Sequence, residues 1–187
     1  CATNGMEVVL KDISKSVAER GKILSEEKLN ALMMEGKISM EKKEEILSRI
    51  TATEKSSEFE QCDLVLEAVF ENQQIKKKVA KEAGKHMDEY SFFGTNTSLL
   101  SIDELSASFP NPQNYIGLHF FAPVDEQPLV EVVKGPATSE ETIARAFDFA
   151  KKIKKTPIIV KDNPGFYAAR VQNVCLLYTS DAADEVD

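Results

Sequence analysis

The chain has 187 residues, of which 42% are hydrophobic and 29% are charged, and its formal net charge is −8. This acidic balance argues against a nucleic-acid-binding protein, which needs clustered basic side chains, and no apolar run approaches the roughly 20 residues that span a membrane. Three Cys without paired spacing and only two His argue against a disulfide scaffold and a metal site, so we expect a protein of a reducing compartment, cytoplasmic or, in a eukaryote, mitochondrial.

Apolar runs alternate with helical patterns along the chain. Residues 7–12 predict a short strand, and charged segments predict helices at 14–34 and 39–49, with Gly36 as a stop and Ser39 as an N-cap. Further strands are expected at 63–69, 91–95, 115–121, 129–134 and 157–161, and helices at 72–87, 101–107, 140–153 and from 166 onward. A capping box from Thr138 to Glu141 opens the helix at 140–153. The alternation predicts an α/β sheet of parallel strands with covered faces and a projecting helical hairpin.

The two ends differ from the rest of the chain. Residue 1 is Cys and a strand pattern follows almost at once, so we expect the chain to begin inside a longer protein. At the other end, residues 175–187 are small and acidic, and 175–185 resemble the translation of a sequencing-library adapter. The alternative is an ordinary acidic tail, and in either case we exclude this segment from the fold.

Asp12 ends the first predicted strand. In a dinucleotide-binding βαβ unit, an acid at the end of the second strand accepts hydrogen bonds from the adenosine ribose. A glycine-rich turn is expected roughly 20 residues before that acid, and the sequence has none. The alternative is an ordinary capping or solvated residue.

His119 lies within an apolar strand pattern, where an imidazole is costly unless its nitrogens find partners. Glu131, on the next apolar strand, could be that partner. A carboxylate on one ring nitrogen sets the tautomer and leaves the other nitrogen free to act as a base. The alternative is a satisfied core histidine. The second histidine, His86, lies in a charged helical segment and is assigned no role.

Polar residues also follow two of the predicted strands. The segment from Asn96 to Ser98 could cap the next helix, or could present a hydroxyl and an amide to a ligand at the carboxyl edge of the sheet. Glu67 and Glu71 end the preceding strand and face the same edge. Residues 76–78 are interpreted as a solvated lysine-rich helix face. Five lysines of the hairpin could pair with a phosphate or could be ordinary surface residues: Lys22, Lys28, Lys37, Lys42 and Lys43.

Five stretches together resemble the L-3-hydroxyacyl-CoA dehydrogenase family. They are VVLKDIS (8–14), DLVLEAVFEN (63–72), GTNTSLLSI (94–102), GLHFFAPVDEQPLVEVVKG (117–135) and KTPIIVKDNPGFYAAR (155–170). The fourth stretch is the most specific, and the fifth is similar to the fused fatty-acid β-oxidation α-subunits, in which this module follows an enoyl-CoA hydratase domain. The resemblance implies a Rossmann-type α/β sheet that lacks its first strand, followed by the start of an all-α domain.

The resemblance implies NAD-dependent oxidation of the 3-hydroxyl of an acyl-CoA. His119 would then be the general base, and Glu131 would orient His119 and stabilise its cationic form. Ser98 would hydrogen-bond the substrate oxygen, and Asn96 would position substrate or nicotinamide.

The cofactor contacts are implied by the same resemblance. Asp12 would hold the adenosine ribose, which favours NAD over NADP because an acid repels a 2′-phosphate. Glu71, Lys76 and Ser98 would lie beside the cofactor, and Lys37 would approach the CoA phosphates.

The resemblance also implies a domain division. Residues 1–164 would form an incomplete NAD-binding domain, 165–174 the start of a helical domain, and 175–187 a non-native tail. Because the phosphate-binding glycine loop would be missing, we expect the 187-residue chain itself to be inactive. The parent protein would be a homodimer or part of a multifunctional β-oxidation complex, with no nucleic-acid partner.

Two positions depart from the family pattern. Ala122 and Ala169 stand where the family often has Asn, near cofactor or substrate, so we expect weaker positioning of the reactants. Three alternatives stay open. They are a 3-hydroxybutyryl-CoA dehydrogenase of butyrate-type metabolism, a non-catalytic crystallin-like protein on the same scaffold, and a dehydrogenase of a hydroxy acid without CoA.

Overall fold

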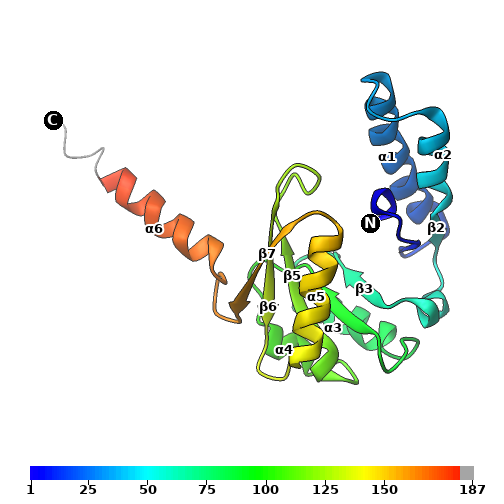
Figure 1. Ribbon diagram of the computed structural model, residues 1–187. Coiled ribbons are helices and arrows are strands. Elements are labelled where there is room, and N and C mark those ends of the chain that lie inside the picture. Colours follow the sequence, from blue (N-terminus) through cyan, green and yellow to red (C-terminus); the bar gives the residue numbers. More distant parts are fainter. Residues whose placement is uncertain (182–187) are drawn as a thin grey trace. The chain divides into compact units, whose positions relative to one another are not determined.

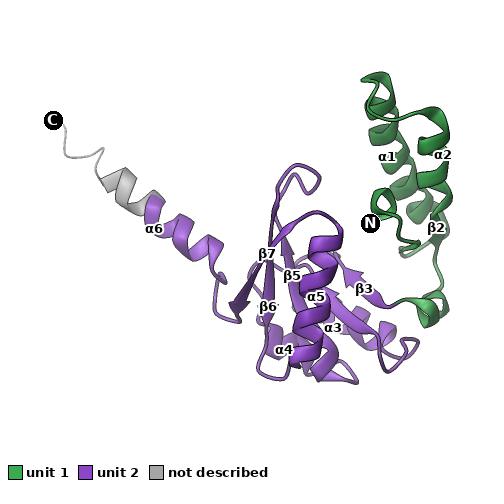
Figure 2. Ribbon diagram, viewed as in Figure 1, with its two compact units in different colours: residues 1–62 green, residues 63–187 purple. Residues whose placement is uncertain are grey.

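The computed structural model describes the backbone of residues 1–181 and the side chains of residues 1–175. The predicted tail at 175–187 therefore lies partly outside the described residues. The chain divides into two compact units, Cys1–Cys62 and Asp63–Asp187 (Figure 2). Each unit has its own sheet.

The first unit contains the predicted helical hairpin, drawn in blue to cyan in Figure 1. Helices α1 (Lys15–Met34) and α2 (Met40–Ser48) are joined by a turn in which Gly36 has a left-handed φ of 70°. Ser39 caps α2, as predicted, by accepting a hydrogen bond from the amide of Lys42. The unit also contains the short 3-10 helices η1 (Ala2–Asn4) and η2 (Ser56–Gln61).

Two parallel strands complete this unit. Strand β1 (Val8–Lys11) pairs with β2 (Ile50–Thr53), with Val8 opposite Ile50. The prediction missed β2, because its four residues, ITAT, alternate with polar side chains and follow the predicted helix without a break. Leu29, Ile46 and Ile50 form the buried core that joins the hairpin to the strands.

The second unit is built on a five-stranded sheet in the order β3-β4-β5-β6-β7 (Figure 1). Its strands are β3 (Leu64–Glu67), β4 (Phe92–Thr95), β5 (Tyr115–Phe120), β6 (Leu129–Lys134) and β7 (Thr156–Lys161). Its helices are α3 (Gln73–Ala83), α4 (Ile102–Ser106), the 3-10 turn η3 (Pro112–Asn114), α5 (Glu140–Lys152) and α6 (Ala168–Asp181). The alternation confirms the predicted α/β class.

One pairing departs from the expected parallel sheet. Strands β3, β4 and β5 are parallel, and so are β6 and β7, but β5 and β6 are antiparallel. The prediction was wrong here because the link at 121–128 is too short for a parallel crossover, which needs a dozen or more residues. As a result, the start of β6 lies beside the end of β5, and Glu131 is directly opposite His119.

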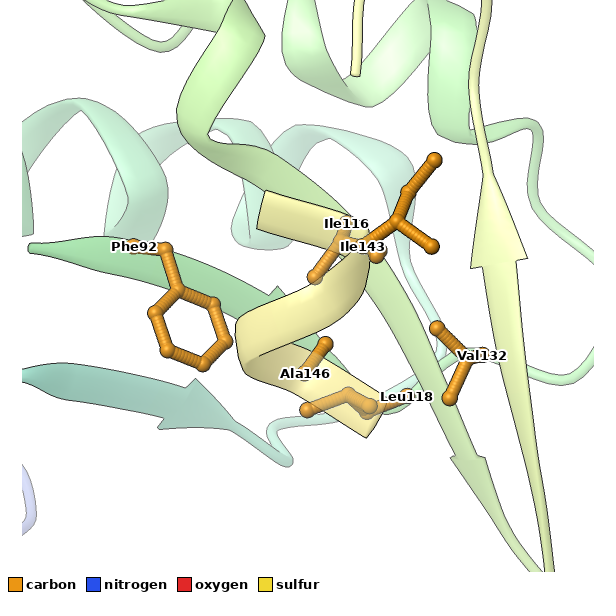
Figure 3. Packing of buried hydrophobic residues seen from close by; sticks show 6 residues of the cluster. All are labelled: Phe92, Ile116, Leu118, Val132, Ile143 and Ala146. Carbon is orange, nitrogen blue, oxygen red and sulfur yellow. The ribbon is translucent and has the colours of Figure 1, made fainter. Parts of the chain in front are cut away.

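Helix α5 covers the centre of this sheet (Figure 3). Ile143 and Ala146 of the helix pack on a cluster of strand residues, namely Phe92, Ile116, Leu118 and Val132. Burying a side chain of the size of Ile143 contributes about 1.5–3 kcal/mol. The cluster thus fixes β4, β5 and β6 relative to one another, and these strands carry Asn96, His119 and Glu131 at or near their ends.

Two predicted caps lie elsewhere in the structure. Ser139 caps α5 by accepting from the Thr142 amide, whereas the Thr138 hydroxyl donates to the Tyr115 carbonyl. Ser101 caps α4, so the segment from Asn96 to Ser98 does not have the helix-capping role that was one of its two interpretations. Within the part of the chain that the structure describes, no helix is long and apolar enough to cross a membrane.

Candidate active site

A buried imidazole–carboxylate pair lies at the carboxyl edge of β5. His119 Nδ1 is 2.7 Å from Glu131 Oε2, and the two residues are register partners across the antiparallel strands. The Glu131 side chain is fully buried, whereas 10% of the His119 side chain is exposed. The pairing that the sequence predicted is therefore present, and it leaves Nε2 as the ring nitrogen that does not contact Glu131.

The second oxygen of Glu131 binds main-chain amides. Oε1 accepts hydrogen bonds from the amides of Tyr167 at 3.0 Å and Ala168 at 2.8 Å, where α6 begins. Burial opposes ionisation of this carboxyl, but the hydrogen bonds from His119, Ala168 and Tyr167 outweigh burial and lower the pKa of Glu131. Glu131 is thus held as an anion beside the imidazole.

Asn96 joins the end of β4 to the end of β5. Its Oδ1 accepts from the amide of Phe120 at 3.1 Å, one residue after His119. The main-chain N–H of Asn96 donates to the Glu67 carbonyl at the end of β3. The structure therefore places the Asn96 side chain against the main chain of the residue that follows His119, and the Phe120 contact leaves the side-chain NH2 of Asn96 unused.

Ser98 is exposed and is held through its main chain. The Glu71 carboxylate accepts from the amides of Ser98 at 2.9 Å and Leu99 at 3.2 Å, and from the hydroxyl of Thr97. Partial burial opposes ionisation of Glu71, but these three hydrogen bonds and the nearby Lys76 lower its pKa. Glu71 thus fixes the turn that presents the Ser98 hydroxyl.

The interpretation of Lys76 as a solvated helix residue was wrong. Its side chain is fully buried, and Nζ lies 2.9 Å from Glu67 Oε1 and 3.4 Å from Glu71 Oε2. Nζ also donates to the carbonyls of Val69 and Asn96. Helix α3 begins after the capping residue Asn72 and turns Lys76 under the ends of β3 and β4, where two carboxylates compensate its charge.

Glu67 is part of the same network. Oε1 accepts from the amide of Val69 as well as from Lys76, and Oε2 accepts from the Thr95 hydroxyl at 2.6 Å. Glu67, Thr95 and Lys76 therefore bind the ends of two neighbouring strands together. Among the residues with predicted roles, the second unit brings His119, Glu131, Asn96, Ser98, Glu71 and Lys76 to the carboxyl edge of β3, β4 and β5.

The first unit carries the two remaining predicted residues. Asp12 directly follows β1, and its Oδ1 accepts from the amide of Ile13 at 2.6 Å. Lys37 lies in the turn between α1 and α2 and forms an exposed ion pair with Glu35. Three other hairpin lysines contact their own unit: Lys22 binds the Ile50 carbonyl, Lys42 binds Glu45 and Lys43 binds Glu26.

Comparison with known proteins agrees with this geometry. Residues 1–163 match the family described as the NAD binding domain of 3-hydroxyacyl-CoA dehydrogenase. The chain belongs to this dehydrogenase family. Its fold and its cofactor class, NAD, are those of the family.

Three named proteins are similar to this chain in sequence, and two of them also in structure. The chain is 38% identical over 170 residues to the fatty acid oxidation complex subunit alpha of Idiomarina loihiensis, covering 91% of the chain and 24% of that protein. It is 34% identical to the (S)-3-hydroxybutyryl-CoA dehydrogenase of Ralstonia eutropha, with a TM-score of 0.89 over 92% of the chain and 61% of that structure. The 3-hydroxybutyryl-CoA dehydrogenase of Escherichia coli gives 32% identity and a TM-score of 0.84, over 88% of the chain and 35% of that structure.

Sequence reasoning missed three contributors to this candidate site. It gave no role to the main-chain amides of Tyr167 and Ala168, nor to the ring of Phe166, which lies 5.8 Å from the His119 ring. Main-chain donors carry no residue-type signal. For the buried Lys76, the available signal was Glu67, because an acid at the end of an apolar strand needs a compensating cation.

Proposed function

We propose that this chain carries the catalytic and cofactor-binding residues of an L-3-hydroxyacyl-CoA dehydrogenase that forms 3-oxoacyl-CoA. The observation that carries the proposal is the buried contact of 2.7 Å between His119 Nδ1 and Glu131 Oε2. A carboxylate held as an anion on one ring nitrogen makes the other nitrogen a base, which is what removal of a hydroxyl proton requires. The chain spans about a quarter of the length of its Idiomarina relative.

In the proposed reaction, His119 Nε2 takes the proton of the substrate 3-hydroxyl. Glu131 stabilises the imidazolium that forms, because its carboxylate stays ionised in its hydrogen-bonded setting. The Ser98 hydroxyl holds the substrate oxygen, and the Asn96 side-chain NH2 orients substrate or nicotinamide. NAD, when bound, supplies the hydride acceptor.

The residues present fit this cofactor. The Asp12 carboxylate follows a strand end and uses Oδ1 for the amide of Ile13, which leaves Oδ2 to accept a ribose hydroxyl. Ser98 presents an exposed hydroxyl at the edge of the other sheet. Glu71 and Lys76 act on the cofactor region through the turn that they hold, and Lys37 contributes a positive charge for the CoA phosphates.

The acyl chain is the finer part of the proposal. A short-chain substrate such as 3-hydroxybutyryl-CoA is the second candidate, because two solved relatives are named 3-hydroxybutyryl-CoA dehydrogenases. A longer acyl chain and assembly into a β-oxidation complex are supported by the name of the Idiomarina relative. Comparison of kcat/KM for acyl-CoA substrates of increasing length decides between these candidates.

The function is tested by replacing the base. In the protein expressed from the open reading frame that encodes this chain, we expect His119→Gln to lower the rate of NADH oxidation with acetoacetyl-CoA about 10²–10⁴-fold. In this direction the imidazole returns the proton as a general acid, and general acid–base catalysis typically contributes that factor. NADH binding, followed by fluorescence, stays near that of the unchanged protein. His86→Gln is the matched control, and its turnover is unchanged.

The opposite results refute the proposal. Equal turnover of the His119→Gln and unchanged proteins would show that the imidazole is not the base. NADH binding without any turnover in the unchanged protein would favour a non-catalytic protein on the same scaffold. Activity on free 3-hydroxybutyrate but not on its CoA ester would replace the proposed substrate class.

A further inference from the structure

The segment between β7 and α6 closes over the His119–Glu131 pair. Gly165 and Phe166 adopt left-handed conformations in succession, with φ values of 73° and 48°. A bulky residue is uncommon in that region, and here Phe166 is also buried, with only 3% of its surface exposed. Phe166 therefore has a tertiary contact that holds it in a sparsely populated conformation, and that contact includes the His119 ring.

The same turn directs two amides at one atom. After Phe166, the amides of Tyr167 and Ala168 both donate to Glu131 Oε1, at 3.0 and 2.8 Å. The Tyr167 carbonyl accepts the first hydrogen bond of the helix, from the amide of Val171. The two amides thus belong to the start of α6, where amides have no partners within the helix.

We propose that the turn from Gly165 to Ala168 is a positioning element of the active site, which holds Glu131 by its second oxygen and encloses the His119 ring with Phe166. This inference rests on the proposed function, because it deepens the role of the same pair. Glu131 has two oxygens with separate tasks: Oε2 binds the imidazole and Oε1 binds the backbone. A carboxylate gripped on one oxygen cannot rotate away from the imidazole without losing both amide bonds.

Apart from His119, the polar groups that contact the Glu131 carboxylate are the amides of this turn. On β5, the titratable group that faces Glu131 is His119. On β7, the register partner of Glu131 is Ile158, and Lys161 lies at the far end beside Lys134. On the segment of the turn and α6, Tyr167 and Arg170 are exposed.

A proline substitution removes one of the two amides without removing a side-chain contact. Ala168 is the first residue of α6, a position that proline tolerates because its missing N–H has no helical partner. Ala168→Pro therefore deletes the donor at 2.8 Å from Glu131. Ala168→Gly is the matched control for the titration, because it changes the same residue but keeps the amide that donates to Glu131.

The readout is an NMR titration of His119, which requires no turnover. The chain has two histidines, His119 and His86, so one variant, His86→Gln, is enough to assign their ring signals. The His119 ring signal senses the acid step of Glu131, whose pKa lies below the ordinary carboxyl value of 4.5. Amide hydrogen bonds favour the charged form, so their loss moves this step to higher pH.

We expect Ala168→Pro to raise the acid step by about one pH unit, since two or three such bonds lower a carboxyl pKa by roughly two. Ala168→Gly should leave the step unchanged. Equal acid steps in Ala168→Pro and the unchanged chain would overturn the proposal, and so would equal shifts in Ala168→Pro and Ala168→Gly.

A second measurement, made at neutral pH, tests the proposal if Ala168→Pro unfolds before the acid step is reached. Nitrogen-15 shifts of the His119 ring report which nitrogen carries the proton. We expect the proton on Nδ1 in the unchanged chain, because Glu131 Oε2 can accept it there. In Ala168→Pro we expect a fraction on Nε2, because a carboxylate released by one amide can rotate away from Nδ1. A tautomer identical in both proteins would contradict the proposal. Failure of the proposed function would instead show in the His119→Gln turnover, with these titrations unaffected.

Discussion

The buried ion pair of Lys76 and Glu67 predicts a large loss of stability when its cation is removed. Lys76→Met keeps an unbranched side chain of similar length but leaves the Glu67 carboxylate, which is 3% exposed, without its ammonium partner. Breaking a buried pair on one side costs about 3–5 kcal/mol, because an uncompensated charge stays in a poorly solvated site. The free energy of unfolding should fall by that amount.

The magnitude translates into a measurable melting shift. For a chain of this size, 1 kcal/mol corresponds to about 2–4 °C, so thermal unfolding followed by circular dichroism should occur roughly 6–20 °C lower. The matched control is Lys78→Met on the same helix, since Lys78 is exposed and surface substitutions stay within about 0.5 kcal/mol.

A double variant separates the lost charge from the lost packing. Glu67→Gln combined with Lys76→Met removes both charges, and the glutamine amide that replaces the Glu67 carboxylate keeps an oxygen to accept from the Thr95 hydroxyl or the Val69 amide. We expect the double variant to be more stable than Lys76→Met alone. If the free energy of unfolding of Lys76→Met lies within about 0.5 kcal/mol of that of the unchanged chain, the ion pair does not hold the strand ends and the reasoning fails.

Two further predictions concern the same unit. Because hydrogen bonding depresses the pKa of Glu71, its contribution to stability is present above about pH 4.5 and is lost as the pH falls through the lower folded value. Glu71→Gln should therefore flatten the acid side of a plot of denaturant midpoint against pH, whereas the exposed Glu89→Gln should not, and identical curves would contradict this. Gly94→Ala would place a methyl group 2.8 Å from the Leu118 side chain, in the buried centre of the sheet. We expect it to lower the free energy of unfolding by about 1–3 kcal/mol in urea titration, and an unchanged midpoint would show that Leu118 can move aside.

Much of this protein follows from local sequence patterns. The alternation of apolar runs and helical segments predicted each strand of the large sheet, because strand and helix periodicities differ and depend on neighbouring residues. Gly36 and Ser39 predicted the hairpin turn and the N-cap of α2, since both effects act within one turn of the chain. The pair of His119 and Glu131 was predicted from polarity, because ionisable groups inside apolar strands require partners.

Other features depended on tertiary structure alone. The four polar-alternating residues of β2 became a strand only because β1 pairs with them. The direction of β6 relative to β5 was decided by the length of a link, and it placed Glu131 opposite His119. Lys76 resembled its neighbours Lys77 and Lys78 in sequence, yet the rotation of α3 turned it into the protein.

The sequence by itself determined the order of the elements apart from β2, the dehydrogenase resemblance and the residues that can exchange a proton. Only the tertiary structure decided how these groups are held. It placed the amides of Tyr167 and Ala168 on Glu131, and it joined Lys76 to Glu67 and Glu71. The physical reason is that main-chain donors are the same in every residue, and a buried charge is recognised only by partners that the fold brings from distant parts of the chain.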